Sequence, residues 1–119
     1  MSKTLVVGAS TNPGRYSNIA IRRLVEHNIE TTAFGIRGGT VSEVQIKHNL
    51  DEFQNIDTVT LYLNPKNQEP YYQQILDLKP RRVIFNPGTE NPEFYKLLEA
   101  EGVEVEVACT LVLLATGQY

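Results

Sequence analysis

The segment KTLVVGASTNPGRYS, Lys3–Ser17, contains the pattern from which we predict the fold. An apolar run ends at Gly8, and a loop of small and turn-forming residues leads into a helical pattern that starts at Ser17. A strand, a glycine-rich turn and a helix in this order are typical of doubly wound α/β proteins. Such a turn seats phosphate on free N–H groups at the positive end of a helix. We therefore expect an anion site at Gly8–Ser17, with an ordinary βα turn as the alternative.

The spacing of this loop excludes two familiar nucleotide-binding motifs. A P-loop ends in Gly-Lys-Ser/Thr, whereas this loop ends in Gly14-Arg15-Tyr16. The dinucleotide fingerprint has glycines at its third and sixth positions, which Ser10 and Pro13 occupy here. The loop is therefore compatible with a phosphate group, but it is not the standard NAD loop.

Length and composition narrow the class of protein. The 119 residues predict one domain, and the net charge of −3 argues against nucleic acid as a partner. The single cysteine excludes an internal disulfide and fits a reducing compartment. No apolar run approaches the roughly 18 residues of a membrane span, and no signal-like run follows Met1. We expect a cytoplasmic protein with no membrane partner.

The remaining pattern alternates strands and helices. Apolar and β-branched runs predict strands at 3–8, 29–36, 58–63, 82–85 and 103–107, with a short strand or ribbon at 41–46. Periodicity and capping residues predict helices at 17–27, 68–78, 92–101 and 109–115, and one helical turn at 49–53. Ser17 and Asn91 are the expected N-caps, and Leu97 is expected on an apolar helix face. This order predicts a Rossmann-like, three-layer α/β sandwich with a mostly parallel sheet of about five strands.

Ligands of such sheets bind beyond the carboxyl ends of the strands. The segments expected at that edge are 8–17, 34–39, 64–65, 86–88 and Cys109. We find no catalytic constellation and no metal-ligand spacing among them. Both histidines, His27 and His48, are expected on the surface, far from this edge. The pattern favours binding over catalysis.

Arg37 follows the second strand, where an NAD site carries an acidic residue for the ribose hydroxyls. A planar guanidinium suits a phosphorylated ribose, because it can bind phosphate in a bidentate way. NADP with its 2′-phosphate and coenzyme A with its 3′-phosphate both qualify. A solvated surface arginine is the alternative.

The loop also resembles that of a known family. Gly8-Ala9-Ser10 followed by Asn12–Ser17 is similar to the G-x-S-x-x-P-x-R-x-S opening of small stand-alone CoA-binding proteins. These are relatives of the N-terminal domain of the succinyl-CoA synthetase alpha subunit. Asn86–Asn91 resembles the family's glycine-containing loop that ends in Asn, and Gly102–Val105 followed by Cys109 resembles its last strand and cysteine. The likeness covers nearly the whole chain in the same order.

The resemblance implies a Rossmann-type CoA-binding domain over residues 1–119, with coenzyme A or an acyl-CoA as its ligand. The pyrophosphate would bind at Gly8, Ala9, Ser10, Asn12, Pro13, Arg15, Tyr16 and Ser17. The 3′-phosphate would lie beside Phe34, Gly35 and Arg37, the adenine or ribose beside Leu63, Asn64 and Pro65, and the pantetheine beside Asn86, Pro87 and Gly88. Two segments depart from the family pattern: Phe34-Gly35-Ile36, where Val-Asn-Pro is frequent, and Asn86-Pro87, where a glutamine often precedes glycine.

Cys109 stands just past a strand and just before a helix, at the expected positive end of the helix dipole. We expect either a buried core residue or, if pantetheine reaches it, a thiol that forms a mixed disulfide with CoA under oxidation.

We therefore predict a small protein that binds a nucleotide ligand, CoA or acyl-CoA, and that is more a binding protein than an enzyme. Synthetase activity is not implied, because the phosphohistidine and the ATP-grasp partner of the larger synthetases have no counterpart here. Two alternatives stay open: an NADP-dependent oxidoreductase or nucleotide sensor, and a degenerate Rossmann module that serves only interaction.

Overall fold

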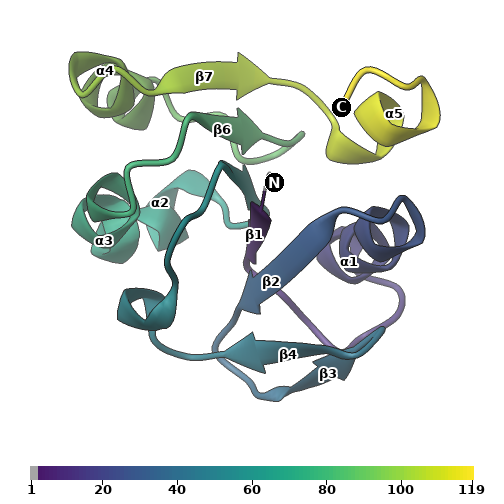
Figure 1. Ribbon diagram of the computed structural model, residues 1–119. Helices are drawn as coiled ribbons and strands as arrows, with labels where there is room; N and C mark the ends of the chain where they lie inside the picture. Colours follow the sequence, from purple (N-terminus) through teal and green to yellow (C-terminus); the bar gives the residue numbers. More distant parts are fainter. Residues whose placement is uncertain (1–2) are drawn as a thin grey trace.

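A computed structural model describes residues 3–119. Seven strands form one sheet in the order β3-β4-β2-β1-β5-β6-β7, and helices cover both of its faces (Figure 1). Every neighbouring pair is parallel except β3 and β4. The predicted Rossmann-like α/β class is confirmed, but the expectation of about five strands was too low.

The bounds of the elements agree with the predicted order. The strands are β1 (Lys3–Val7), β2 (Glu30–Phe34), β3 (Gly39–Val41), β4 (Val44–Lys47), β5 (Thr58–Leu61), β6 (Arg82–Phe85) and β7 (Glu104–Val107). The α-helices are α1 (Tyr16–Glu26), α2 (Pro65–Gln68), α3 (Tyr72–Asp77), α4 (Pro92–Ala100) and α5 (Thr110–Ala115). Two 3₁₀ turns complete the fold, η1 (Leu50–Glu52) and η2 (Glu69–Tyr71).

The additional strands come from the segment predicted as one short strand or ribbon. Ser42 and Glu43 have φ angles of 47° and 68°, the left-handed pair that a two-residue hairpin turn requires. This turn folds β3 back on β4 as an antiparallel hairpin. β4 then pairs in parallel with β2 through Ala33 and Ile46. The hairpin therefore extends the parallel sheet by one strand and ends it with an antiparallel edge.

Two helix starts differ from the prediction. Arg15 stands at the N-cap position of α1 without a side-chain cap, and Ser17 is buried inside the first turn. The helix predicted at 68–78 begins earlier, at Pro65, because the Asn64 side chain accepts a hydrogen bond from the Asn67 N–H at 2.9 Å. It then passes through η2, which contains Pro70, before α3 begins.

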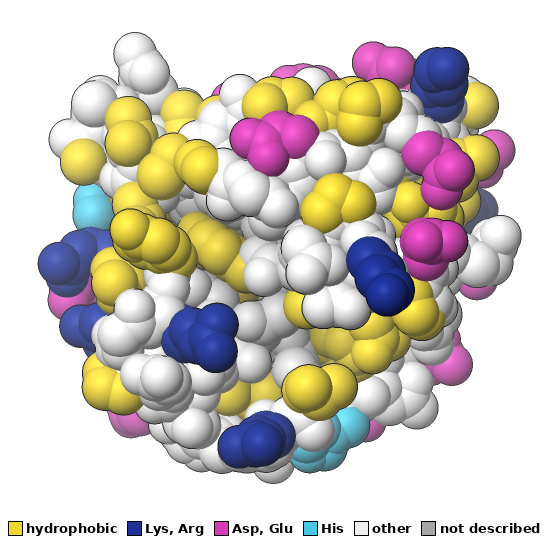
Figure 2. Space-filling view, turned by 180° about the vertical axis from the view of Figure 1, so that it is seen from behind, with side chains coloured by type: hydrophobic (Ala, Val, Ile, Leu, Met, Phe, Trp, Pro, Cys, Tyr) yellow, Lys and Arg dark blue, Asp and Glu magenta, His cyan; other side chains and the backbone are white. Residues whose placement is uncertain are grey.

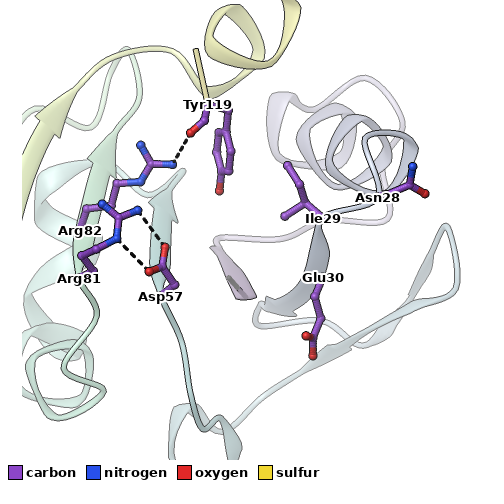
Figure 3. Close-up of a pocket in the computed structure, with 7 residues that line it drawn as sticks. All are labelled: Asn28, Ile29, Glu30, Asp57, Arg81, Arg82 and Tyr119. Carbon is purple, nitrogen blue, oxygen red and sulfur yellow. Dashed lines mark hydrogen bonds and ion pairs between the residues drawn. The ribbon is translucent and has the colours of Figure 1, made fainter. Parts of the chain in front are cut away.

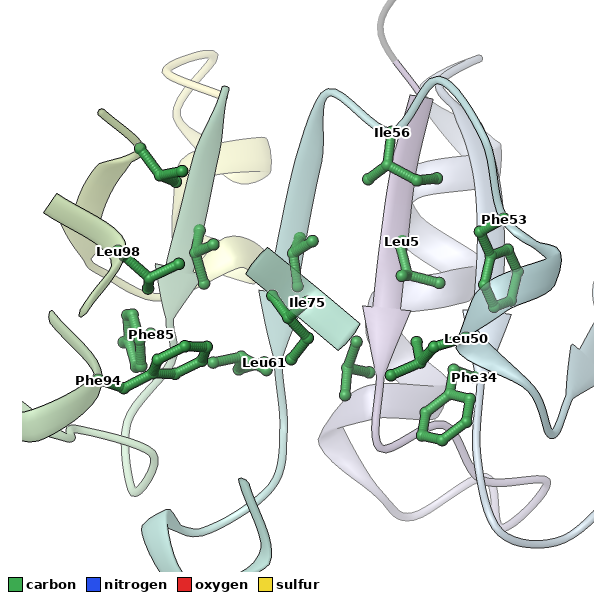
Figure 4. Packing of buried hydrophobic residues seen from close by; sticks show 14 residues of the cluster. Leu5, Phe34, Leu50, Phe53, Ile56, Leu61, Ile75, Phe85, Phe94 and Leu98 are labelled. Atoms are coloured by element: carbon green, nitrogen blue, oxygen red, sulfur yellow. The ribbon is translucent and has the colours of Figure 1, made fainter. Parts of the chain in front are cut away.

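The two faces of the sheet bury separate hydrophobic cores. Alternate strand residues such as Leu5, Leu61 and Phe85 pack under α3, α4 and η1 (Figure 4). The opposite face packs Val6, Ala33 and Ile46 against α1 and α5. Each buried aliphatic side chain contributes roughly 1.5–3 kcal/mol by leaving water.

Asn91 caps α4 as predicted, because its Oδ1 accepts a hydrogen bond from the Phe94 N–H at 3.3 Å. Leu97 was expected on the apolar face of α4, yet this residue is 40% exposed, because Phe94, Tyr95 and Leu98 make the contact of α4 with the core.

Candidate functional site

The loops that follow the parallel strands meet at one edge of the sheet. β1 lies between β2 and β5, so the direction of winding reverses at β1. The crevice at such a reversal is where open α/β sheets bind ligands. Figure 2 shows the molecule from behind the view of Figure 1; hydrophobic side chains lie in the hollowed parts of this face, with separate Lys and Arg side chains around them.

The start of the glycine-rich loop is tied to β2. The N–H groups of Gly8 and Ala9 both donate to the Phe34 carbonyl at 2.9 Å. Gly8 has a φ of +95°, and a Cβ atom there would stand 3.1 Å from the carbonyl carbon of Tyr62. Glycine is required at this position because the loop turns tightly against the neighbouring strand end. The donors of Gly8 and Ala9 thus hold the loop and are not free for a ligand.

The shape of the loop is set by its own polar side chains. Ser10 Oγ accepts from the Asn12 N–H at 3.1 Å, and Asn12 Oδ1 accepts from the Gly14 N–H at 2.9 Å. Two residues of α1 form hydrogen bonds that support the loop. Asn18 Nδ2 donates to the Ser10 carbonyl, and Arg22 donates through Nε to Asn18 Oδ1, both at 2.9 Å. The sequence analysis missed this pair; its signal is the i, i+4 spacing of two polar residues on the helix face nearest the loop.

Helix α1 begins directly after this loop, at Tyr16. The Arg15 carbonyl accepts from the N–H groups of Asn18 and Ile19 at 3.0 and 3.1 Å. The N–H groups of Tyr16 and Ser17 have no hydrogen-bond partner within residues 3–119. The first turn carries no acidic residue, so the positive end of the helix dipole is not offset there. Arg15 and Tyr16 are exposed beside these donors, and Pro13 is exposed on the loop. This arrangement can accept an anion.

The loop after β2 lies against the glycine-rich loop. A Cβ atom on Gly35 would stand 2.5 Å from the Ala9 carbonyl oxygen, so only glycine allows the two main chains to approach this closely. A Cβ atom on Gly39 would collide with the Thr11 side chain. Phe34, which precedes Gly35, is buried. Arg37 is exposed and forms no ion pair with any residue in 3–119.

His48 corrects the sequence analysis. It was expected far from the ligand edge, but it directly follows β4, whose carboxyl end lies beside that of β2. Its Nδ1 lies 3.0 Å from the Gly35 carbonyl oxygen. The error arose because a hairpin was not predicted with certainty, and only the hairpin makes the strand before His48 parallel to β2. His27 lies at the end of α1, as expected.

A buried glutamine joins the loops after β5 and β6. Gln68 is fully buried, and its Nε2 donates to the carbonyls of Leu63 and Thr89, both at 2.8 Å. Its Oε1 accepts from Asn91 Nδ2 at 2.9 Å. Asn64 and Pro65, two predicted site residues, form the cap and the first residue of α2 directly after Leu63. The sequence analysis missed Gln68, because a polar residue in an amphipathic pattern reads as solvent-facing.

Asn86 acts as an internal cross-link. Its Nδ2 donates to Thr60 Oγ1 at 2.7 Å and to the Leu61 carbonyl at 2.8 Å. Its Oδ1 accepts from the Thr110 N–H at 2.8 Å. Both donors of this side chain are therefore used within the protein, and the next two residues, Pro87 and Gly88, are the exposed part of the loop.

Cys109 is partly exposed at the N-cap position of α5 and forms no side-chain cap. The Tyr62 hydroxyl lies in the same region, is buried, and has no hydrogen-bond partner within residues 3–119. Burial raises the pKa of Tyr62 to about 12, with the Cys109 thiol as a second cause. The phenol therefore stays protonated at neutral pH.

A separate cavity of about 240 Å³ lies at the opposite, amino-terminal edge of the sheet (Figure 3). Each charged side chain that lines it has an ion-pair partner. Arg81 Nε lies 2.9 Å from Asp57 Oδ1, and the hydrogen bond from Arg81 holds the pKa of Asp57 below its ordinary value. The buried Arg82 pairs with Glu106 at 2.8 Å and donates to the Tyr119 carbonyl at 3.2 Å. This cavity therefore offers little unneutralised charge to a ligand.

No group of three or more His, Cys, Asp or Glu side chains in residues 3–119 is placed to hold a metal ion. No helix in the same range is long and apolar enough to cross a membrane.

The sequence of this chain matches the model of one known protein family. A family model described as a CoA binding domain matches residues 2–115. The chain belongs to this CoA-binding domain family. The family resemblance predicted from the glycine-rich loop is thereby confirmed.

Solved structures that are similar to this chain include proteins of nearly the same length. A crystal structure of an uncharacterized protein is 44% identical, with a TM-score of 0.96 over 100% of this chain and 98% of the other. A hypothetical protein from Pyrococcus horikoshii OT3 is 28% identical, with a TM-score of 0.83 over 93% of this chain and 80% of the other. A Thermus thermophilus protein shares the fold at 21% identity, with a TM-score of 0.88 over 99% and 90%. A comparison with curated proteins gives no match.

Proposed function

We propose that this chain binds coenzyme A or an acyl-CoA at the carboxyl edge of its sheet, and that it does so as a binding protein without a catalytic step of its own. One observation carries the proposal. The close approaches of Gly35 to Ala9 and of Gly39 to Thr11 bring the loop that carries Arg37 against the glycine-rich loop, which leads into the N-terminus of α1. Two separate anion contacts side by side suit a ligand with two phosphate groups, and CoA carries a pyrophosphate and a 3′-phosphate.

The pyrophosphate is assigned to the N-terminus of α1. The Tyr16 and Ser17 N–H groups would donate to it, and the Arg15 guanidinium would add a charged contact. Ser10 and Asn12 would act indirectly, since their side chains hold the loop in shape. The donors of Gly8 and Ala9 would keep the loop on β2.

The two ends of the ligand are assigned to opposite sides of β1. Arg37 follows β2 and would take the 3′-phosphate, beside Phe34 and Gly35. β5 lies on the other side of β1, so one strand separates the segment Leu63–Pro65 from the β2 loop that carries Arg37. Leu63–Pro65 would line the adenine or ribose side of the ligand. Pro87, Gly88 and Cys109 would lie along the pantetheine arm, because β6 and β7 follow β5 in the sheet.

Thermal unfolding with a set of ligands tests the proposal. A ligand that binds only the folded state stabilises it by about 2.7 kcal/mol at a hundred times its dissociation constant. For a domain of this size we expect the melting temperature to rise by roughly 10 °C. The rise should be clear with CoA or a short acyl-CoA, smaller with dephospho-CoA, and slight with NADP or NAD. Mass spectrometry under non-denaturing conditions should first show that the protein carries no co-purified nucleotide.

A matched pair of arginine variants controls this experiment. Arg15→Ala should reduce the shift with both CoA and dephospho-CoA, since both contain the pyrophosphate. Arg23→Ala changes an exposed arginine in the last turn of the same helix, where it pairs with Glu26 at 3.0 Å, and should leave both shifts unchanged. A larger shift with NADP than with CoA would support an oxidoreductase instead. No shift with any ligand would support an interaction module.

A further inference from the structure

His48 is held in a defined position at the ligand edge. Its Nδ1 lies 3.0 Å from the Gly35 carbonyl oxygen, which can only accept a hydrogen bond. Nδ1 must therefore carry the hydrogen. In a neutral imidazole the other nitrogen, Nε2, then has none and can only accept. Nε2 gains a hydrogen, and becomes a donor, only when the ring takes up a proton.

The free nitrogen of His48 lies against the Arg37 loop. A Cβ atom on Gly38 would stand 3.1 Å from Nε2 and 3.6 Å from Cε1 of this ring. A side chain at position 38 would thus cover Nε2, and glycine leaves it open. Arg37 is the residue directly before Gly38, and both Arg37 and His48 are exposed.

Few other charges surround the His48 ring. The segment Gly8–Gly14 and strand β3 contain no titratable side chain. On the β2 loop the charged group is Arg37. Lys47 precedes His48 and pairs with Glu52 of η1 at 3.9 Å, which leaves Asp51 as the other acid on that turn.

We propose that His48 joins Arg37 in binding the 3′-phosphate of CoA, and that its imidazole takes up a proton when it does so. The inference rests on the proposed function, and it names the second contact by which the site would distinguish CoA from dephospho-CoA. Nε2–H would donate to a phosphate oxygen, while Nδ1–H keeps its bond to Gly35. The one covalent change is the N–H bond that forms at Nε2 with a proton from the solvent, whose donor loses that proton.

The pH dependence of ligand discrimination tests the proposal. Calorimetry would give the ratio of the affinities for CoA and dephospho-CoA at about pH 6.5 and about pH 8, a range in which histidine changes charge and the phosphate stays largely dianionic. In the wild type we expect this ratio to be roughly three- to tenfold higher at the lower pH, because only the protonated ring donates through Nε2 to the phosphate. In His48→Gln the ratio should be the same at both values, because glutamine cannot take up a proton.

His27→Gln is the matched control. His27 is the other histidine of the chain, its Nδ1 lies 2.7 Å from the Arg23 carbonyl oxygen, and it stands at the end of α1 away from the ligand edge. Its ratio should change with pH as in the wild type. If His48→Gln weakens both ligands equally and keeps the pH dependence, His48 only supports the loop and the inference is wrong. If the wild type binds neither ligand, the proposed function itself fails.

Discussion

The two edges of the sheet differ in whether their arginine side chains have carboxylate partners. At the amino edge, the guanidinium groups of Arg81 and Arg82 each have carboxylate partners, and Arg82 also lies over the Tyr119 ring, 4.6 Å from its centroid. At the carboxyl edge, Arg37 has no ion-pair partner within residues 3–119, and the first two N–H groups of α1 are also free.

The difference shows how to distinguish a structural edge from a binding edge. The cavity of about 240 Å³ lies at the amino edge, where the charges already neutralise one another. The carboxyl edge keeps donors that cost stability unless an anion or water satisfies them. Under the proposed function, the unsatisfied donors at the carboxyl edge, and not the cavity volume at the amino edge, mark where the ligand would bind. Substitutions at the amino edge should change the free energy of unfolding, and those at the carboxyl edge should change binding.

The largest expected effect is on stability at the amino edge. Arg82→Ala removes a buried guanidinium that contacts Thr58, Glu106 and the Tyr119 carbonyl. Breaking a buried pair costs about 3–5 kcal/mol, because the partner loses its counter-charge. Urea unfolding should show this loss. Arg81→Ala, the neighbouring change, should cost about 1 kcal/mol or less, because its side chain is 57% exposed. Equal losses for the two variants would contradict the contrast drawn between buried and exposed pairs.

The next effect combines stability and binding. Gln68→Leu leaves the Leu63 and Thr89 carbonyls without their donor, and each unsatisfied buried group costs about 1–3 kcal/mol. We expect unfolding at lower urea and weaker CoA binding in the protein that remains folded, since the loops after β5 and β6 lose their link. Gln73→Leu, which changes an exposed glutamine bonded to Asp77, is the control and should alter neither. Unchanged CoA affinity in folded Gln68→Leu would separate these loops from the site.

At the carboxyl edge, a change should affect binding alone. Arg37→Ala should weaken CoA by roughly 1.5–3 kcal/mol, the value of a hydrogen bond to a charged group, and leave dephospho-CoA nearly unchanged. The free energy of unfolding should stay the same, because Arg37 forms no ion pair within residues 3–119. Calorimetry with both ligands measures the difference. Equal losses for CoA and dephospho-CoA would remove Arg37 from the 3′-phosphate position.

The smallest effect concerns acid stability. The hydrogen bond from Arg81 lowers the pKa of Asp57, so the ionised carboxyl favours the folded state. This contribution is complete above the ordinary aspartate pKa of about 3.9 and is lost as the pH falls through the lower folded value. As the pH falls from about 5 to about 2, the free energy of unfolding should therefore decrease less in Arg81→Ala than in the wild type. The difference between the two decreases should be at most about 1 kcal/mol. Parallel pH profiles of urea unfolding would contradict this.

Local signals in the sequence were sufficient for most of the fold. The apolar run before Gly8, the Asn91 cap and the turn at Gly102, with a φ of +78°, each act over a few residues, and each was predicted. The Ser17 cap was wrong, because packing against the sheet draws Ser17 inside and the helix starts one residue earlier. The hairpin was only partly predicted, since its turn depends on the left-handed pair Ser42-Glu43 without a glycine.

The amino-acid sequence was sufficient to predict the α/β order, the glycine-rich loop and the family. These follow from periodicity and from contiguous motifs, which need no knowledge of distant contacts. The tertiary structure alone decided which donors stay free. The Phe34 carbonyl accepts from the N–H groups of Gly8 and Ala9, which lie about 26 positions earlier in the chain. The Asn86 side chain forms hydrogen bonds with Thr60 and Thr110. His48 lies beside the Gly35 carbonyl only because β4 pairs with β2 in the sheet. Hydrogen bonds between residues far apart in the chain are set by packing, and a linear pattern does not contain them.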